Sequence, residues 1–124
     1  MAKIKIENDT LKIELSLLDQ LLALHSSIEM PFSHVTNAFV SDFEDLEIQY
    51  KLTGTGAGFF KMAGIFANPS GLIFCDVDGE RDCLVIETRG ERFPRIAVTL
   101  DKGVDVNALA HEIVQKIPDS GPVE

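Results

Sequence analysis

The sequence has no tryptophan, one tyrosine and two cysteines, and each shortage excludes a class of protein. Because there is no tryptophan and only one tyrosine, we expect no aromatic platform that stacks nucleobases. Two cysteines are too few for the disulfide framework of a small secreted protein. We therefore expect the thiols to be reduced, as they are in the cytoplasm.

Positive charge is also scarce, because eleven Lys and Arg face twenty Asp and Glu, for a net charge of −9. Such a surface repels phosphate backbones, so we expect no nucleic-acid partner and no strong binding to anionic membranes. No apolar run approaches the roughly 18 residues that a membrane span needs. The N-terminal MAKIKIENDT alternates charge with isoleucine, unlike a signal peptide, which predicts a cytoplasmic protein.

The length and composition are those of a single domain. The chain has 124 residues, close to the commonest domain size. A chain of this length buries roughly two-thirds of its unfolded surface, enough for a core without metal or disulfides. We expect one domain over residues 1–117 and a flexible tail at 118–124.

Alternation of apolar and polar residues predicts a mainly β fold with one small helix near its start. Residues 3–7 and 10–15 alternate around Asn8-Asp9, which predicts a hairpin, and leucines at helical spacing predict a helix over about residues 17–24. A helical turn is predicted at 43–46. The remaining predicted strands lie at 27–31, 35–40, 60–67, 72–77, 83–88 and 95–100, the last four as a meander.

The C-terminal element has the clearest pattern. From Val106 to Ile117, apolar residues recur at the spacing of one helix face. Asp105 is suited to cap this helix, and Pro118 ends it. With seven or eight strands before it, this helix predicts a strand meander whose open end the helix covers.

Five stretches carry a further signal: MPFSHV at 30–35, LTGTG at 52–56, AGIF at 63–66, the strand around Phe74, and RGERFPRI at 89–96. Together they resemble the pleckstrin-homology-like proteins of bacteria, over roughly residues 3–117. The resemblance implies a split β-barrel of about seven strands capped by a C-terminal helix, a scaffold that carries many binding roles. Its lipid-binding eukaryotic members have a basic cluster between the first two strands, whereas this chain has the acidic ENDT at 7–10.

All four arginines fall within fifteen residues of an otherwise acidic chain. Arg89, Arg92 and Arg95 surround one predicted turn, next to Phe93. Because arginine forks suit carboxylate and phosphate groups, this turn is a candidate contact for an anion or a partner. The alternative is that the arginines pair at the surface with the interspersed acids Glu80, Asp82, Glu87 and Glu91.

Glycines at wide spacing predict a mobile loop over 53–60. Gly54, Gly56 and Gly58 lie in this loop, and Phe59 closes it. A phosphate-binding loop would need Gly-Lys-Ser or Gly-Lys-Thr before a helix, which the chain lacks. We expect either a flexible loop or a loop that contacts a partner. Gly64 predicts a bulge or a tight packing point in a strand.

The two cysteines bracket a predicted hairpin turn rich in carboxylates. If the turn has three or five residues, Cys75 stands opposite Cys83, where a disulfide would be strained and reducible. The alternative is a pair of packed, reduced thiols. Asp76, Asp78 and Glu80 alternate around Gly79 as carboxylates do in a calcium loop, and Asp82 follows. An EF-hand would need flanking helices, whereas the flanking segments are predicted strands, so a solvated hairpin tip is expected. The histidines have no zinc-site spacing, so no metal or cofactor is expected.

Two functions remain open. The first is a binding or scaffold module that contacts a protein partner or a second copy through a sheet edge, the 53–60 loop or the turn at 89–95. The second is a carrier of a small molecule or anion, or an enzyme, that uses the barrel mouth with the glycine-rich loop as a lid. The first is favoured, because the chain has no nucleophile elbow and no recognisable Ser or Cys constellation.

Overall fold

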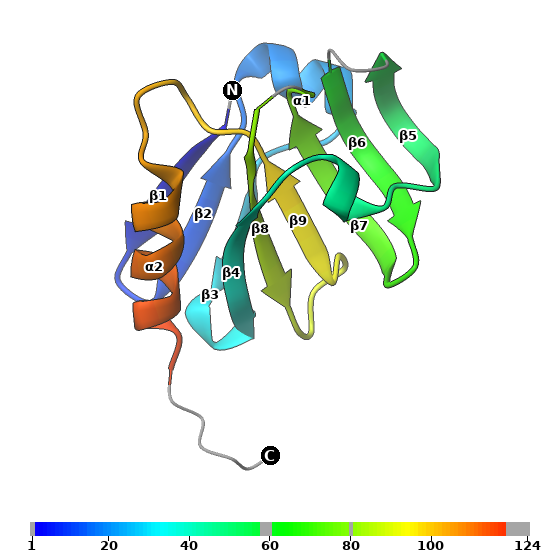
Figure 1. Ribbon diagram of the computed structural model, residues 1–124. Coiled ribbons are helices and arrows are strands. Elements are labelled where there is room, and N and C mark those ends of the chain that lie inside the picture. Colours follow the sequence, from blue (N-terminus) through cyan, green and yellow to red (C-terminus); the bar gives the residue numbers. More distant parts are fainter. Residues whose placement is uncertain (1, 58–60, 80, 119–124) are drawn as a thin grey trace.

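The structure is a computed structural model that describes residues 2–57, 61–79 and 81–118 (Figure 1). The elements follow in the order β1 (Lys3–Glu7), β2 (Thr10–Glu14), α1 (Leu17–Ala23), β3 (Ile28–Pro31), η1 (Phe32–His34), β4 (Val35–Ser41), η2 (Glu44–Leu46), β5 (Tyr50–Ala57), β6 (Lys61–Asn68), β7 (Gly71–Val77), β8 (Cys83–Thr88), β9 (Arg95–Val98) and α2 (Val106–Lys116). Most of the predicted elements are confirmed to within a few residues. The predicted tail beyond Pro118 lies outside the described residues.

The strands form two sheets. The smaller is antiparallel, with the order β1-β2-β3, and the larger has the order β4-β8-β9-β7-β6-β5. Within the larger sheet β7 and β9 are parallel, and every other neighbouring pair is antiparallel. The mainly β fold with a C-terminal helix is therefore confirmed. In the described part of the chain there are nine strands instead of about seven, and they close no barrel.

The predicted meander is wrong at one point, because β9 lies between β7 and β8. Phe74 of β7 opposes Ile96 of β9, and Ile96 opposes Ile86 of β8. The physical reason is burial, since Ile96, Ala97 and Val98 are all buried. A strand buried on both faces belongs in the middle of a covered sheet. Because β9 is apolar on both faces, neither face can be turned to solvent. The strand therefore lies between β7 and β8, which the sequence predicts to be paired as a hairpin.

The two faces of the larger sheet carry separate clusters of buried side chains. One face packs against the smaller sheet and the helices, through buried residues that include Leu11, Ile13, Ala23, Phe74, Ile86, Ile96 and Ile113. The opposite face carries a smaller cluster with Leu46, Phe66, Ile73, Cys75, Val77, Cys83, Val85 and Ala97. Figure 1 shows that the connection from β4 to β5, which contains η2, crosses this second face.

Side chains cap both helices at their N-termini. The Ser16 hydroxyl accepts a hydrogen bond from the Asp19 amide at 3.1 Å, which begins α1. The Asp105 carboxylate accepts one from the Ala108 amide at 3.0 Å, as predicted for the start of α2. Neither helix in the described residues has the length and hydropathy of a membrane span.

The predicted loop at 53–60 is wrong over most of its length, because β5 continues to residue 57; Gly58 and Phe59 lie outside the described residues. Gly54 opposes Gly64 across the β5–β6 pair, with φ of 97° and 142°. A Cβ at Gly54 would lie 2.1 Å from the Ala63 carbonyl oxygen, and one at Gly64 would lie 2.2 Å from that of Thr53. Glycine is therefore required here for close approach of two strands, which confirms the tight packing point predicted at Gly64.

Candidate functional site

Helix α1 presents an apolar surface to solvent. Leu17, Leu18, Leu21 and Leu24 are 84%, 63%, 69% and 69% exposed, and we call them the α1 leucine face. On the other side of the helix, Ala23 is buried and Leu22 is packed against the core. Large apolar side chains that gather on one exposed helix face are typical of an interaction surface.

Leu24, which ends α1, has a left-handed backbone conformation with φ 56°. Glycine is the usual residue at this position of a helix end, and another residue held there adds about 1 kcal/mol of strain. The Leu24 side chain is mostly exposed, so burial within the chain does little to offset the strain. An exposed leucine in a strained conformation points to a role outside the isolated fold.

A buried charge cluster anchors α1 to the sheet. Its centre is the Lys61 ammonium at the start of β6, which lies 3.1 Å from Asp19 Oδ1, 2.8 Å from Asp76 Oδ1 and 3.6 Å from Asp78 Oδ1. Asp19, on the inner side of α1, is 4% exposed, and Asp76 is 1% exposed. The predicted solvated position of Asp76 is therefore wrong, because this carboxyl group is buried against a cation.

The Lys61 cluster changes the protonation of its own members. Burial raises the pKa of Asp76 to about 6, and the hydrogen bond with Asp19 adds to this. Burial opposes ionisation of Asp19, but its hydrogen bond with Asp76 and the Lys61 ammonium outweigh burial and lower its pKa. Burial likewise opposes the charge on Lys61, yet the two carboxyl groups raise its pKa. Below about pH 6 the pair of acids thus holds a proton, beside a charged lysine.

Asp76→Asn is expected to remove a pH dependence of stability. Because the pKa of Asp76 is raised from 3.8, its contribution is fully present below about pH 4 and is lost as pH rises through about 6. The free energy of unfolding of the wild type, relative to the variant, should fall by about 2 kcal/mol across this range. Urea unfolding at several pH values measures this, with the more exposed Asp101→Asn as control. Parallel curves for wild type and Asp76→Asn would contradict it.

The arginine turn predicted from the sequence is largely engaged within the chain. Arg89 donates from Nε to the Ser33 carbonyl at 3.2 Å, and Arg95 pairs with Glu87 at 2.9 Å. The guanidinium of Arg92 lies 5.1 Å from the centre of the Phe93 ring. Phe93 itself is buried, with its ring 5.6 Å from that of Phe74. The alternative of pairing with neighbouring acids is confirmed for Arg95, and a partner role for this turn stays a prediction.

The predicted opposition of Cys75 and Cys83 is wrong because β9 separates their strands. Cys75 opposes Ala97, and Ala97 opposes Val85, so Cys83 lies two residues further along β8. Both thiols are free and buried. Burial raises the pKa of each, which keeps the reactive thiolate scarce. The alternative of packed, reduced thiols agrees with this arrangement.

The predicted site residues do not converge on one place. The arginine turn joins β8 to β9, whereas Gly54 and Gly56 lie on β5, at the edge of the larger sheet and three strands away from β9. Among residues 2–57, 61–79 and 81–118, no three His, Cys, Asp or Glu side chains are arranged to hold a metal ion. Neither the outward direction of the α1 leucines nor the Lys61 cluster is predicted from the residue pattern.

No family model, no curated protein and no solved structure matches this chain. The geometry of the α1 leucine face and of the Lys61 cluster therefore carries the functional inference.

Proposed function

We propose that this protein is a binding module that associates with a second copy of itself through the α1 leucine face. The observation that carries the proposal is the exposure of these four leucines, between 63% and 84%, on one short helix. No charged side chain of α1 shares this surface, because its only charged residue, Asp19, is buried. A two-fold axis brings the same patch of two copies together, so leucines would meet leucines.

The charge of the chain supports a second copy as the partner. Two chains of net charge −9 repel each other, and they can approach most closely where neither carries charge. Burying the four leucines of each copy would contribute on the order of 10 kcal/mol. The lower values for the free-energy cost of association are about 4 kcal/mol, so about 6 kcal/mol is left, which predicts a weak dimer with a Kd on the order of tens of micromolar.

The helix is also held in place before it binds. The Thr55 hydroxyl of β5 donates a hydrogen bond to the Leu22 carbonyl oxygen at 2.8 Å, and Lys61 binds Asp19. An interface on a fixed helix loses less conformational entropy on binding than one on a mobile segment. These contacts therefore support α1 as a docking element.

Replacing Leu18 and Leu21 together with glutamate is expected to abolish the dimer. Four carboxylates would then meet at the two-fold interface, whereas both positions are exposed in the single chain and tolerate charge. Sedimentation velocity over a range of concentrations measures the monomer–dimer equilibrium. The matched control is Val104→Glu with Val114→Glu, which charges exposed apolar residues away from α1. A wild-type chain that stays monomeric at the highest concentration would overturn self-association.

Leu24→Gly is expected to raise stability and weaken the dimer at once. Glycine adopts the left-handed conformation without strain, so the free energy of unfolding should rise by about 0.5–1 kcal/mol. Loss of this side chain from both copies removes about a quarter of the leucine burial, which should weaken the dimer roughly 50- to 100-fold. Urea unfolding of the dilute monomer and sedimentation measure the two effects. Glu47→Gly, also at positive φ, should raise stability and leave the dimer unchanged.

The relation to pleckstrin-homology-like proteins stays a prediction. It is supported by an N-terminal hairpin, further strands and a C-terminal helix in the expected order. The parallel β7–β9 pair and the two separate sheets depart from a simple barrel of about seven strands. A cytoplasmic location is likewise proposed, from the sparse cysteines and the acidic composition.

A further inference from the structure

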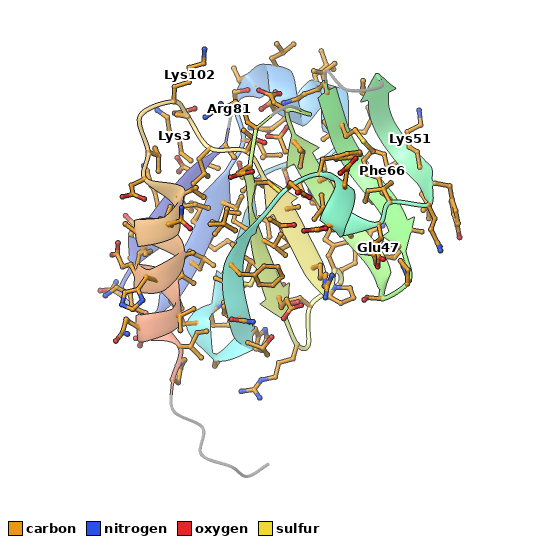
Figure 2. All side chains as sticks on the ribbon, in the orientation of Figure 1. Lys3, Glu47, Lys51, Phe66, Arg81 and Lys102 are labelled. Carbon is orange, nitrogen blue, oxygen red and sulfur yellow. The ribbon has the colours of Figure 1, made fainter. Side chains whose placement is uncertain are left out.

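A cavity of about 380 Å³ lies on the face of the larger sheet that η2 crosses. It is lined by Phe43 and Ile48 from the crossing segment, Tyr50, Lys51 and Gly56 from β5, and Met62 and Phe66 from β6. Figure 2 shows Phe66 beside η2 and Lys51 on the neighbouring edge strand. The α1 helix packs with the core on the opposite face, so the cavity is separate from the α1 leucine face.

Gly56 leaves the space that forms part of this cavity. A Cβ built at this position lies 3.8 Å from both Lys51 Cδ and Phe66 Cε2, which is ordinary contact. Its φ is not in the left-handed region, unlike that of Gly54, so the backbone does not require glycine here. Glycine inside a strand weakens the strand and often marks a place where another group approaches. The strand does not require glycine at position 56, whereas the cavity requires the space that a side chain there would fill.

The lining sets the chemistry of an occupant. Among the described residues of the lining, three aromatic rings, Ile48 and Met62 provide apolar walls, and Lys51 is the single charged residue. The Lys51 ammonium donates to the Gly54 carbonyl oxygen at 3.3 Å, and it takes part in none of the ion pairs between described residues. An apolar pocket with one well-placed charge selects a ligand with an apolar body and one group of opposite charge.

The volume limits the size of the ligand. A water molecule occupies about 30 Å³ in the liquid, and a non-hydrogen atom of an organic ligand takes a similar share. The cavity therefore has room for roughly a dozen such atoms. This is the size of a medium-chain fatty acid or of an aromatic acid with a short side chain.

We propose that this cavity binds a small apolar carboxylate. Its apolar body would lie between Phe43, Met62 and Phe66, and its carboxylate would bind the Lys51 ammonium. Because the chain is acidic overall, an anion is held only where this cation is close. This would be a small-molecule site on a protein that we also propose to form a dimer. The cavity shares no residue with the α1 leucine face, so ligand binding does not depend on the dimer.

Titration with decanoate tests the proposal, with heat of binding and thermal unfolding as the two measurements. We expect saturable binding with a Kd on the order of 100 μM. At ten times this concentration the melting temperature should rise by roughly 4 °C. Decanol should bind about tenfold more weakly, and decyltrimethylammonium more weakly still. If decyltrimethylammonium binds as tightly as decanoate, or no ligand saturates, the proposal is overturned.

Two variants locate the site. Gly56→Leu places a side chain in the cavity without backbone strain, and should weaken decanoate binding at least tenfold. Lys51→Gln lies on an exposed position, so it leaves the fold intact and should weaken decanoate about tenfold but decanol hardly at all. Leu18→Glu with Leu21→Glu is the matched control and should bind decanoate as the wild type does. Loss of binding in this control, with full binding in Gly56→Leu, would place the ligand on α1 and overturn the cavity.

Discussion

Replacing Lys61 with methionine is expected to lower the free energy of unfolding by roughly 3–5 kcal/mol, the largest loss for any charged residue discussed. The Asp19 and Asp76 carboxyl groups lie 3.1 and 2.8 Å from the Lys61 ammonium, and both are buried. Methionine keeps the apolar length of lysine but leaves these acids without their cation. Urea unfolding at pH 7.5 measures the loss.

The pH dependence and two further variants separate this effect from a simple loss of packing. At pH 5 the Asp76 carboxyl group, with its pKa raised to about 6, is mostly neutral, so Lys61→Met should be less harmful there. Adding Asp19→Asn and Asp76→Asn to Lys61→Met should restore most of the stability. Lys5→Met removes an exposed ion pair with Glu14 at 3.6 Å and should change stability by under about 0.5 kcal/mol. A loss from Lys61→Met as small as that control would contradict the argument.

Gly64→Ala is expected to destabilise the protein by roughly 3 kcal/mol or more, because two penalties act at one position. The φ of 142° is strained for any residue with a side chain, at about 1–3 kcal/mol. In addition, the new Cβ would lie 2.2 Å from the Thr53 carbonyl oxygen, so β5 and β6 must separate. Chemical denaturation followed by circular dichroism measures the loss.

Two alanine variants distinguish the penalties. Gly103→Ala also has a positive φ, of 90°, but no atom lies within 4 Å of the new Cβ, so it should show the conformational penalty alone. Gly56→Ala has neither penalty and should be close to neutral or slightly stabilising. If Gly64→Ala is no more harmful than Gly103→Ala, close approach of the strands is not what requires glycine at position 64.

Local patterns were sufficient for elements whose determinants are close in the sequence. The N-cap at Asp105 and the hairpin around Asn8 depend on residues a few positions apart, and both are confirmed. Widely spaced glycines usually favour loops, so the sequence predicts a loop at Gly54 where the structure has the strand β5. The conformation of Gly54 depends instead on its partner Gly64 in β6. A pattern of neighbouring residues does not show which residues pair across two strands.

The candidate site was harder to predict for the same reason. With five leucines between positions 17 and 24, α1 is apolar on nearly every side, so its sequence does not show which face is buried. Asp19 would be expected to face water. It faces inward because Lys61, from a distant part of the chain, supplies a buried cation. Only the fold brings these two charges together and turns the leucines outward.

The central position of β9 has a consequence for the order in which the protein is built. In the described chain, β9 is the strand that joins β4-β8 to β7-β6-β5, and it comes after all of them in the sequence. On the ribosome, β7 and β8 therefore each expose an unpaired edge until residues 95–98 emerge. The larger sheet becomes continuous only at that moment, so its folding waits for the last of its own strands to be made.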